Sequence, residues 1–526
     1  MPRITIDGRE VDVAEGATIL DAADKAGIQI PTMCFLKGHK PLTSCMVCVV
    51  KVVGSSHLVP ACGAIVKDGM RIENNCEEVH NARKAALELL LSDHVGDCMG
   101  PCQVVCPARM DIPLMIRQIA SGRLRDAIAT VKKDIALPAV LGRICPKPCE
   151  KACRRAAYDE AVSICLLKRY VADVDLGSLE PYLPVCKPNT GKRVAVVGGG
   201  PAGLAAAYYL RQEGFECTVF DDHDEPGGML RYGVPPEQLP RDVLRREIAL
   251  IEKLGVMFRN GTRVGHDISM EELRRDFDAV FVAVGEVKED GAVNLGLAAD
   301  KDGIQVDSRT YATNLQGVFA GGDAVRRRRL TVRSVADGKE AAVSIGQFLS
   351  GQQVVGAGRA FNSHIGQLKE GEIEKFIAIV DKGPRVKPHQ AEGGFTDDEA
   401  GQESLRCLGC DCRKAGNCRL RQLSEVYGAK SVRFKGERRL FVQETRHSTV
   451  VYEPGKCINC GLCVQITAEA GEELGLTFVG RGFDVRVAVP FGRTLAEGLR
   501  ASAAKCVEAC PTGAIAFTNR GASNCG

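Results

Sequence analysis

The stretch KRVAVVGGGPAGLAAAYYLRQEGFECTVFD, residues 192–221, determines the fold class of the central part of the chain. Its pattern indicates an apolar strand, a glycine turn, a helix of small residues and a second strand that ends at Asp221. Gly198, Gly200 and Gly203 form G-x-G-x-x-G, and Asp221 follows 23 residues after Gly198. Such glycines let the backbone approach a pyrophosphate at a helix N-terminus, and the acid can bind a ribose hydroxyl. The stretch therefore predicts a Rossmann-like dinucleotide site.

Composition limits the classes of function. The 526 residues are enough for several domains, and 45% hydrophobic with 26% charged residues is ordinary for a globular protein. A net charge of +3, no Trp and 5% aromatic residues give no reason to expect a nucleic-acid partner. No signal peptide is visible at the start, and no apolar run approaches the ~18 residues that span a bilayer. We expect a cytoplasmic protein without membrane insertion.

The N-terminal segment, residues 1–78, carries the first of several cysteine groups. Its sequence predicts a hairpin that turns at Asp7-Gly8 and a helix from residue 17 to about residue 26. In a reducing cytosol clustered cysteines are metal ligands more often than disulfides. The spacing C-x10-C-x2-C-x13-C suits one [2Fe–2S] cluster, with a structural zinc site as the alternative. Its four ligands are Cys34, Cys45, Cys48 and Cys62. The order of elements resembles the N-terminal β-grasp ferredoxin domain of the large iron–sulfur subunit of complex I and of related hydrogenases.

A predicted helical domain, residues 79–190, has two cysteine triplets, each spaced C-x3-C-x3-C. Six thiolates in about 60 residues suggest two [4Fe–4S] clusters. The segments CPARMDIP (106–113) and PAVLGRICPKPCEKAC (138–153) resemble the N-terminal helical domain of the glutamate synthase small subunit family. That family includes ferredoxin-dependent NADPH transhydrogenases and the front end of dihydropyrimidine dehydrogenase.

This resemblance implies how the triplets share their clusters. One cluster takes Cys106, Cys145 and Cys149, and the other takes Cys98, Cys102 and Cys153. For the second cluster, His94 is the expected fourth ligand, because H-x3-C resembles the histidine-ligated cluster of the complex I subunit; the alternative is a surface histidine. For the first, the family uses a carboxylate or amide where this chain has Lys168. Cys165 lies three residues earlier and is the expected substitute, the alternative being a buried free cysteine.

The Rossmann-like domain, residues 191–352, is expected to bind FAD. GGMLRYGVP (227–235) and GVFAGGDAV (317–325) resemble the flavin-contacting segments of the same family. The resemblance assigns flavin contacts to Gly227, Gly228, Met229, Leu230, Gly285, Gly322 and Asp323. The family inserts an NAD(P)H domain between the strand FVAVG (281–285) and the segment GVFAGGDAV, but only 31 residues separate Gly285 from Gly317. We expect no nicotinamide site of the family's type here; a shrunken yet working site is the alternative.

Two cysteine groups follow a predicted linker, residues 353–400. In the module 401–440, the spacing C-x2-C-x-C-x5-C favours a local [4Fe–4S] site over zinc; its ligands are Cys407, Cys410, Cys412 and Cys418. The module 441–526 begins like a two-cluster ferredoxin, C-x2-C-x2-C-x3-C-P, but the fourth position is Thr467. By the ligand exchange of such ferredoxins, one ferredoxin-like cluster is held by Cys457, Cys460, Cys463 and Cys510. The positions of its neighbour cluster are Thr467, Arg500, Ala503 and Cys506, so that cluster is not expected.

The sequence as a whole predicts a multidomain α/β and α+β oxidoreductase with FAD, one [2Fe–2S] and four [4Fe–4S] clusters. We identify no catalytic side chain and expect an electron-transfer subunit that relays, and as an open alternative bifurcates, electrons. The expected partners are other oxidoreductase subunits. One would be a complex I-like FMN/NADH-binding subunit, and the other a substrate-reducing or -oxidising partner such as formate dehydrogenase, hydrogenase or ferredoxin. The alternatives are a self-sufficient NAD(P)H-dependent reductase and a scaffold with structural metal sites.

Overall fold

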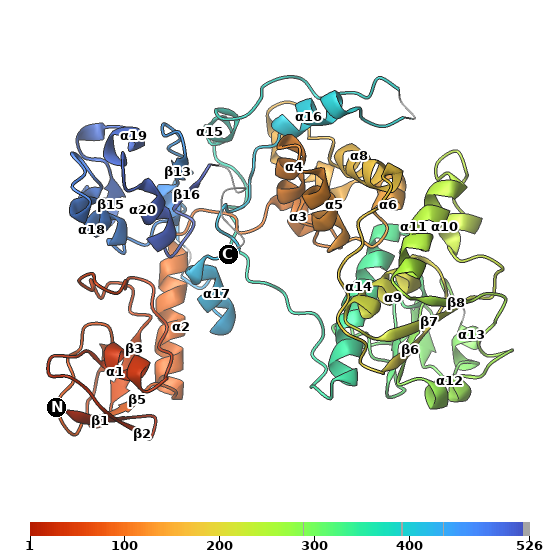
Figure 1. Ribbon diagram of the computed structural model, residues 1–526, viewed down its shortest axis with the longest axis horizontal. Coiled ribbons are helices and arrows are strands. Elements are labelled where there is room, and N and C mark those ends of the chain that lie inside the picture. The colour runs from red at the N-terminus through yellow and green to blue at the C-terminus, as the bar shows by residue number, and fades with distance from the viewer. Residues whose placement is uncertain (288, 391–392, 435, 519–526) are drawn as a thin grey trace. The chain divides into compact units, whose positions relative to one another are not determined.

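The structure is a computed structural model that describes residues 1–287, 289–390, 393–434 and 436–518 (Figure 1). Its contacts divide the chain into two units. Unit 1 comprises Met1–Met99, Ala360–Ile379 and Gly409–Gly526; unit 2 comprises Gly100–Arg359 and Val380–Leu408. Each unit therefore includes segments that are distant in sequence. This division differs from the linker 353–400 and the module 401–440 expected from the sequence, because each of these segments is shared between the two units.

The N-terminal part of unit 1 is a mixed five-stranded sheet. Its strands are β1 (Arg3–Ile6), β2 (Arg9–Asp12), β3 (Val49–Val52), β4 (Leu58–Pro60) and β5 (Arg71–Glu73), in the order β2-β1-β5-β3-β4. The turn between β1 and β2 has Asp7 and Gly8 at positive φ, as the predicted hairpin requires. Helix α1 (Ile19–Lys25) begins at a capping box in which the Thr18 hydroxyl accepts the Asp21 N–H. The predicted hairpin and helix are confirmed.

The rest of unit 1 contains helices of different lengths and two short antiparallel sheets of two strands each. The helices are α2 (Glu77–Ser92), α15 (Ile373–Ile377), α17 (Arg419–Val426), α18 (Leu462–Glu469), α19 (Leu495–Gly498) and α20 (Ala503–Ala509). The antiparallel strand pairs are β13 (Val450–Tyr452) with β16 (Ile515–Phe517), and β14 (Thr477–Val479) with β15 (Arg486–Ala488). Helices α18 and α20 pack on each other beside β16.

Unit 2 begins with a helical region. Its helices are α3 (Pro101–Val105), α4 (Ile112–Ala120), α5 (Leu124–Lys132), α6 (Pro138–Ile144), α7 (Pro148–Lys151) and α8 (Ile164–Gly177), joined later in the chain by α16 (Asp397–Leu405). Helix α8 packs on α6 and α5, and α16 packs on α4 and α8. The predicted linker, residues 353–400, therefore contains α15 of unit 1 and the first turn of α16, whose capping box at Thr396 fixes its start.

The Rossmann-like part of unit 2 is built on a five-stranded parallel sheet in the order β12-β9-β6-β7-β8. The strands are β6 (Arg193–Val197), β7 (Glu216–Phe220), β8 (Met257–Arg259), β9 (Ala279–Val282) and β12 (Val318–Ala320). Alternate residues face opposite sides. Val194 and Val196 pack in one core with α9 (Pro201–Gln212), α11 (Arg241–Lys253) and α14 (Thr331–Leu349), while Ala195 and Val197 pack in another core with α12 (Met270–Asp276). The sheet is thus buried on both faces, as a parallel sheet requires.

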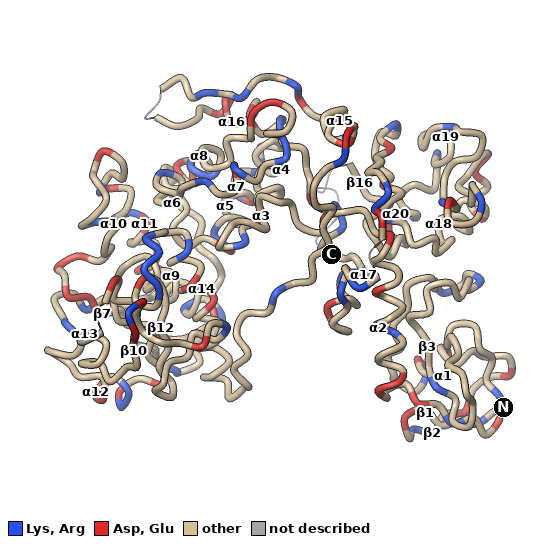
Figure 2. Tube along the Cα trace, turned by 180° about the vertical axis from the view of Figure 1, so that it is seen from behind, with Lys and Arg blue, Asp and Glu red and all other residues tan. Residues whose placement is uncertain are grey.

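Between Gly285 and Gly317 the described residues form only short elements. These are α13 (Glu289–Val293) and an antiparallel pair of two-residue strands, β10 (Ala299–Asp300) and β11 (Gly303–Ile304). The remaining short helix of unit 2 is α10 (Met229–Tyr232). Within the described chain, no helix has the length and apolar character that would let it cross a membrane. Figure 2 shows basic and acidic residues interspersed along both units.

Candidate cofactor sites

The glycine turn at the start of α9 is shaped by contacts that exclude side chains. Gly198 has φ +106°, and a Cβ there would lie 2.4 Å from the carbonyl oxygen of Ala283. A Cβ on Gly203 would lie 1.9 Å from the carbonyl oxygen of Gly198. At Gly200, the N-cap of α9, the nearest atom to such a Cβ is 4.0 Å away, so the helix N-terminus stays accessible to a ligand. Backbone N–H groups and the helix dipole favour a phosphate there, and the residues present fit a dinucleotide.

Other predicted flavin contacts lie beside this turn. The Gly227 N–H donates to the Gly199 carbonyl at 2.8 Å. A Cβ on Gly228 would lie 2.9 Å from the Gly200 Cα, and one on Gly322 would lie 2.9 Å from the Ala202 Cβ. The loop that carries Gly227 and Gly228 and the segment that carries Gly322 therefore both approach the first turn of α9. Met229 is exposed and Leu230 buried, while Gly285 has φ +75° with open space around it.

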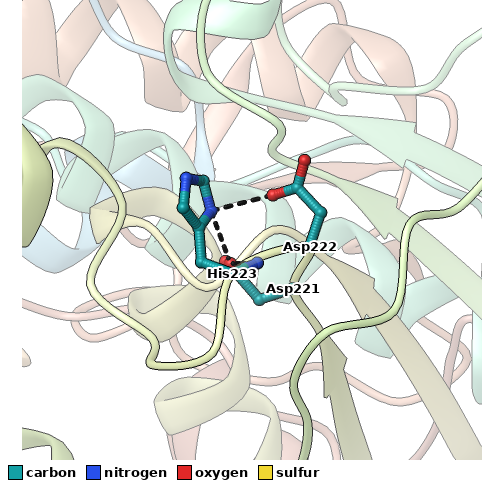
Figure 3. A group of neighbouring side chains, drawn as sticks. All are labelled: Asp221, Asp222 and His223. Atoms are coloured by element: carbon teal, nitrogen blue, oxygen red, sulfur yellow. Dashed lines mark hydrogen bonds and ion pairs between the residues drawn. The ribbon is translucent and has the colours of Figure 1, made fainter.

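The two predicted acidic contacts are held by backbone donors. Asp221 accepts the Gly199 N–H at 2.6 Å and the His223 N–H at 2.9 Å, and its Oδ1 lies 3.0 Å from the His223 Nδ1. Asp222 is also 2.8 Å from that imidazole nitrogen (Figure 3). Asp323 accepts the backbone N–H groups of Arg328 and Arg329, each at 3.2 Å. Asp221 thus fixes the glycine turn to the end of β7.

The four N-terminal thiols predicted to hold a [2Fe–2S] cluster converge in unit 1. All four cysteines are buried. The Cys48 Sγ lies 3.4 Å from the Cys62 Sγ. Hydrogen bonds from Cys45 and Cys62 lower the pKa of Cys34, which shows that this thiol also faces the group. Four converging buried thiols with no disulfide fit a cluster of this kind.

The four thiols predicted for the ferredoxin-like module line one cavity. Cys457, Cys460, Cys463 and Cys510 surround it together with Tyr452 and Val487. Burial raises the pKa of Cys457 to about 11 and that of Cys460 to about 12, and the neighbouring thiols add to both effects. Iron binding would relieve this cost, because a thiolate bound to a metal no longer faces apolar surroundings alone.

Position 467, where a two-cluster ferredoxin has a cysteine, is used differently. The Thr467 hydroxyl donates to the Val464 carbonyl at 3.0 Å and accepts the Leu476 N–H at 3.0 Å. Cys506 is buried in the apolar core of this region, and its thiol donates to the Cys463 carbonyl at 3.9 Å. Both side chains therefore stabilise the protein fold around the cavity.

In unit 2 four thiols surround the ammonium group of Lys168. Burial alone would lower the pKa of Lys168, but Cys165, Cys145, Cys149 and Cys106 outweigh it and raise that pKa. Cys165 also interacts directly with Cys145 and Cys149. The grouping is the one expected from the sequence, with Cys165 in fourth place. Lys168 is a buried charge beside the site, a role that sequence reasoning missed because the side chain was considered only as a ligand.

Cys98 lies beside two cysteines with which the sequence did not group it. Its set was expected to include Cys102 and Cys153, but these two cysteines belong to unit 2 and Cys98 to unit 1. The Cys412 N–H donates to the Cys98 carbonyl at 3.4 Å, and Cys412 and Cys98 both act electrostatically on Cys418. The expected local set of the 401–440 module is divided as well, because Cys407 belongs to unit 2 and the other three cysteines to unit 1. This segment passes from one unit to the other at residue 409.

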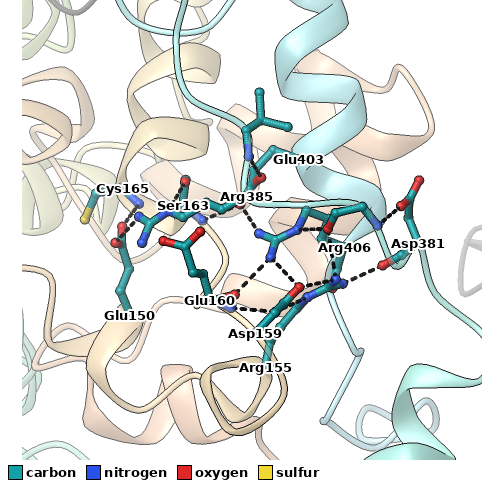
Figure 4. A network of polar contacts seen from close by, with 12 residues as sticks. Glu150, Arg155, Asp159, Glu160, Ser163, Cys165, Asp381, Arg385, Glu403 and Arg406 are labelled. Atoms are coloured by element: carbon teal, nitrogen blue, oxygen red, sulfur yellow. Dashed lines mark hydrogen bonds and ion pairs between the residues drawn. The ribbon is translucent and has the colours of Figure 1, made fainter.

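The remaining thiols of unit 2 lie where a distant segment joins the helical region. Cys102, Cys153 and Cys407 are half-buried at the edge of one core. Two residues after Cys153, the Arg155 guanidinium donates to the carbonyl of Arg406, which directly precedes Cys407, at 2.7 Å (Figure 4). Arg155 also binds Asp159, which lowers the pKa of that carboxyl to about 2. These contacts hold the two cysteine-bearing segments together.

Apolar packing connects the thiol sites of unit 1. One buried cluster contains Cys34, Cys45, Cys418 and Cys460 together with residues of α2. Cys34 acts on the pKa of Cys460, and Cys510 acts on that of Cys418. Sites that the sequence places hundreds of residues apart are therefore neighbours around one core.

Four family models match the chain. They are a 2Fe-2S iron–sulfur cluster binding domain at residues 2–77, dihydropyrimidine dehydrogenase domain II with a 4Fe-4S cluster at residues 71–178, an NAD(P)-binding Rossmann-like domain at residues 196–253, and a pyridine nucleotide-disulphide oxidoreductase domain at residues 237–338.

Curated relatives share parts of this arrangement. The NADPH-Fe(3+) oxidoreductase subunit beta of Geobacter sulfurreducens is 45% identical over 189 residues, which are 35% of this chain and 28% of the relative. The NADP(+)-dependent formate dehydrogenase subunit beta of Moorella thermoacetica is 40% identical over 224 residues, covering 39% and 31%. The glutamate synthase [NADPH] small chain of Bacillus subtilis is 40% identical over 186 residues, covering 35% and 37%.

The matched region thus spans about a third of the length of these relatives. The relatives are subunits of multi-subunit oxidoreductases, and the family models assign iron–sulfur and pyridine nucleotide oxidoreductase domains in the order seen in the structure. The chain therefore contains iron–sulfur and pyridine nucleotide oxidoreductase domains, and over about a third of its length it is similar to subunits of iron–sulfur and flavin oxidoreductases such as the glutamate synthase small chain.

Proposed function

We propose that this chain is the FAD- and iron–sulfur-containing electron-transfer subunit of a multi-subunit oxidoreductase. It relays electrons between a partner that binds NAD(P)H, resembling the FMN subunit of complex I, and a low-potential partner such as ferredoxin, formate dehydrogenase, hydrogenase or another reductase. A flavin exchanges one or two electrons and an iron–sulfur cluster exchanges one, so together they connect two-electron and one-electron partners.

The observation that carries this proposal is the succession of thiol sites around one apolar core. Cys34 of the first site acts on Cys460 of the ferredoxin-like site, and Cys510 of that site acts on Cys418. Redox groups held by these cysteines would be close neighbours in a surrounding that excludes water. A protein with isolated structural metal sites has no need for such proximity.

The short connection after β9 supports the need for a nicotinamide-binding partner. From Val284 to Gly317 the described residues contain only α13 and the two-residue strands β10 and β11. One βαβ unit alone takes about 30 residues, and a nucleotide-binding domain needs several strands, so this interval is too short for such a domain. The glycine turn at α9 is then the dinucleotide site that this chain contributes, and we assign it to FAD.

The proposal is tested by anaerobic titration of the purified chain. Without a partner, we expect NADH and NADPH to leave the flavin absorbance unchanged over minutes, whereas dithionite bleaches it. Adding a complex I-like FMN subunit should then make NADH effective. Rapid bleaching by NADPH alone would instead support the self-sufficient reductase.

The self-sufficient reductase is the second candidate, because the Rossmann-like model is described as NAD(P)-binding and because the relatives' names include NADPH. An iron and sulfide content of about 18 each per chain, with one FAD, is expected for the electron-transfer subunit with all its clusters. A metal content dominated by zinc would favour a structural scaffold.

A further inference from the structure

Two chain segments of unit 1 meet although 314 positions separate them. Residues 94–98 end the first segment of the unit, and residues 412–418 lie near the start of its last segment. The Cys412 N–H donates to the Cys98 carbonyl at 3.4 Å. All of unit 2 is encoded between these two points. The contact therefore joins two segments of unit 1 that are separated in the sequence by the whole of unit 2.

A third segment fixes the geometry of Cys98. The Cys98 N–H donates to the Ser363 carbonyl at 3.0 Å, and the Ser363 N–H donates to the Cys98 Sγ at 3.4 Å. On either side, the Met99 N–H donates to the Asn362 amide oxygen at 3.0 Å and the Ile365 N–H donates to the Asp97 carboxylate at 2.9 Å. An N–H group that points at a cysteine sulfur is a donor that tunes cluster potentials.

The sulfur atoms of Cys98, Cys412 and Cys418 form a buried group. All three residues are buried, and Cys98 and Cys412 both lie near enough to Cys418 to act on it electrostatically. A Cβ on Gly513 would lie 2.3 Å from the Cys412 Sγ, which places this thiol against the loop after Cys510. Cys412 and Cys418 are only six residues apart, with a turn between them, so both can face one centre.

The segment that ends at Cys98 also carries a buried histidine, His94. It stands four residues before Cys98, and its Nδ1 is buried without a hydrogen-bond partner among the described residues. The backbone on either side is held in place, since the Val95 N–H donates to the Gly455 carbonyl at 2.7 Å. Lys456 packs against Gly96 between the histidine and the cysteine, and it acts electrostatically on both His94 and Cys98. A buried imidazole nitrogen without a hydrogen-bond partner, such as the His94 Nδ1, is suited to bind a metal.

We propose that His94, Cys98, Cys412 and Cys418 bind one [4Fe–4S] cluster, whose ligand set is interrupted in the chain by unit 2. The inference rests on the proposed iron–sulfur function and specifies one of its sites. It replaces two groupings expected from the sequence, that of Cys98 with Cys102 and Cys153, and that of Cys412 and Cys418 with Cys407 and Cys410.

Three thiolates and one imidazole also suit a structural zinc ion. The position of the group favours iron. Cys418 belongs to the same apolar cluster as Cys34, Cys45 and Cys460 of the neighbouring sites, and Cys510 acts on it. A zinc ion at this position could not accept an electron, so it would interrupt electron transfer between the neighbouring thiol sites. A [4Fe–4S] cluster at the same position would allow that transfer.

The first test uses the wild-type holoprotein, reduced stepwise with dithionite and examined by electron spin echo envelope modulation. We expect one reduced cluster to show strong coupling to a histidine nitrogen, identified by 15N-histidine labelling. His94→Cys should keep about 18 irons per chain and lose that coupling. Absence of a nitrogen-coupled cluster in the wild type, or its persistence in His94→Cys, would overturn the assignment of His94.

The second test compares two cysteines that are two residues apart. Cys412→Ala and Cys98→Ala should each lose about four of about 18 irons together with the nitrogen-coupled signal. Cys410→Ala should retain that signal, and Cys76→Ala, at a thiol outside every proposed site, should retain all iron. If the nitrogen-coupled signal survives Cys412→Ala but is lost in Cys102→Ala or Cys153→Ala, the grouping predicted from the sequence is correct and ours is wrong. One zinc ion per chain with about 14 irons would also contradict the proposal.

The two proposals can fail separately. Bleaching of the flavin by NADPH alone would overturn the need for a partner and leave the nitrogen coupling unchanged. A nitrogen coupling that does not depend on Cys412 would overturn the split site and leave the flavin titration unchanged. Because the wild-type measurement needs no substitution, the test holds even where a cysteine variant does not fold.

Discussion

Both units of this protein incorporate a segment from far along the chain, but they hold it by different means. In unit 1, residues 97–99 meet residues 362–365 and Cys412 through hydrogen bonds that backbone N–H groups donate to carbonyl, side-chain oxygen and thiol acceptors, beside buried thiols. In unit 2, the segment Val380–Leu408 is held by ion pairs and charged hydrogen bonds of Arg155, Arg385, Glu403 and Arg406 (Figure 4).

This difference indicates whether the contacts that hold each unit together form from the protein alone or also need a bound metal. Guanidinium–carboxylate pairs form from the protein alone, and Glu403 also accepts the backbone N–H groups of Ser163 and Val386 at 2.7 and 2.8 Å. The clustered thiols of unit 1, such as Cys457 and Cys460, have raised pKa values because they are buried. Such thiols contribute most to stability once a metal binds them as thiolates. We therefore expect the integrity of unit 1 to depend on iron more strongly than the junction of unit 2 does. Four predictions test this comparison, from the largest effect to the smallest.

The largest effect is expected at the ferredoxin-like site of unit 1. Cys510→Ala should lose about four of about 18 irons per chain, because its thiol lines the cavity with Cys457, Cys460 and Cys463. Cys506→Ala, in helix α20 whose C-cap is Cys510, should keep all iron, since that thiol lies in the apolar core and donates to a carbonyl. Iron and sulfide analysis decides the matter, and equal losses in both variants would show that burial alone governs retention of the cluster.

The junction of unit 2 should depend on charge. Arg406 is 1% exposed and Glu403 0%, and their side chains pair at 2.9 Å. Arg406→Ala leaves an uncompensated buried carboxylate, so we expect a loss of about 3–5 kcal/mol in the free energy of unfolding. The control Arg493→Ala removes an exposed partner of Glu497 and should cost less than about 1 kcal/mol. Urea unfolding followed by circular dichroism measures both; a similar small cost for the two variants would remove the contrast between the units.

Unit 2 should also respond to pH through Glu247. Its carboxylate accepts the N–H groups of Ala139 at 2.8 Å and Val140 at 2.9 Å, and burial raises its pKa to about 7 from an ordinary 4.5. Because the folded state binds the proton more tightly than the unfolded state, the contribution is fully present below pH 4.5. It is lost as pH rises through about 7, at a cost of about 3 kcal/mol.

Urea midpoints between pH 5 and 8 measure this dependence. The wild type should lose stability as pH rises to about 7, and Glu247→Gln should lack that component because an amide does not titrate. An unchanged slope in Glu247→Gln would assign the effect to another group.

The smallest effect concerns the packing of α14 on α9. A Cβ on Gly338 would lie 2.2 Å from the Ala202 carbonyl oxygen, so Gly338→Ala should cost about 1–3 kcal/mol and reduce the flavin content. On the same helix, a Cβ on Gly346 would lie 3.6 Å from the nearest atom, in the ring of Phe215. Gly346→Ala should therefore retain flavin and gain up to about 1 kcal/mol. Flavin absorbance per chain and thermal unfolding separate the two; full flavin in Gly338→Ala would show that the helices can move apart freely.

Sequence reasoning succeeded where the deciding contacts are local. The hairpin at Asp7-Gly8 is formed within ten residues, and the glycine turn follows a strand and opens a helix, so its backbone conformation can be inferred from the glycines. The structure also brings Cys165 near the same lysine as Cys106, Cys145 and Cys149, because three residues along a helix place Cys165 on the same face as Lys168; that the four thiols share a cluster stays a prediction.

Sequence reasoning was less informative where a short segment is divided between the two units. Cys407, Cys410, Cys412 and Cys418 lie within 12 residues, which favours one local site, but the chain changes unit at residue 409. The partner of Cys98 could not be inferred, since nothing in a run of 314 residues indicates that its ends meet. Ser363 acts through its backbone N–H, which any residue other than proline provides, so the sequence carries no signal for it.

The contact between Cys98 and Cys412 determines when, during synthesis of the chain, a metal can be bound by both residues. A ribosome adds about 5–20 residues per second, so about 15–60 s pass between the synthesis of Cys98 and that of Cys412. During that interval the N-terminal thiols are present while their partners do not yet exist. The four cysteines of the N-terminal sheet are all made within the first 62 residues, so their site can be filled early. Any metal bound by Cys98 together with Cys412 must arrive after the whole of the inserted unit has been translated.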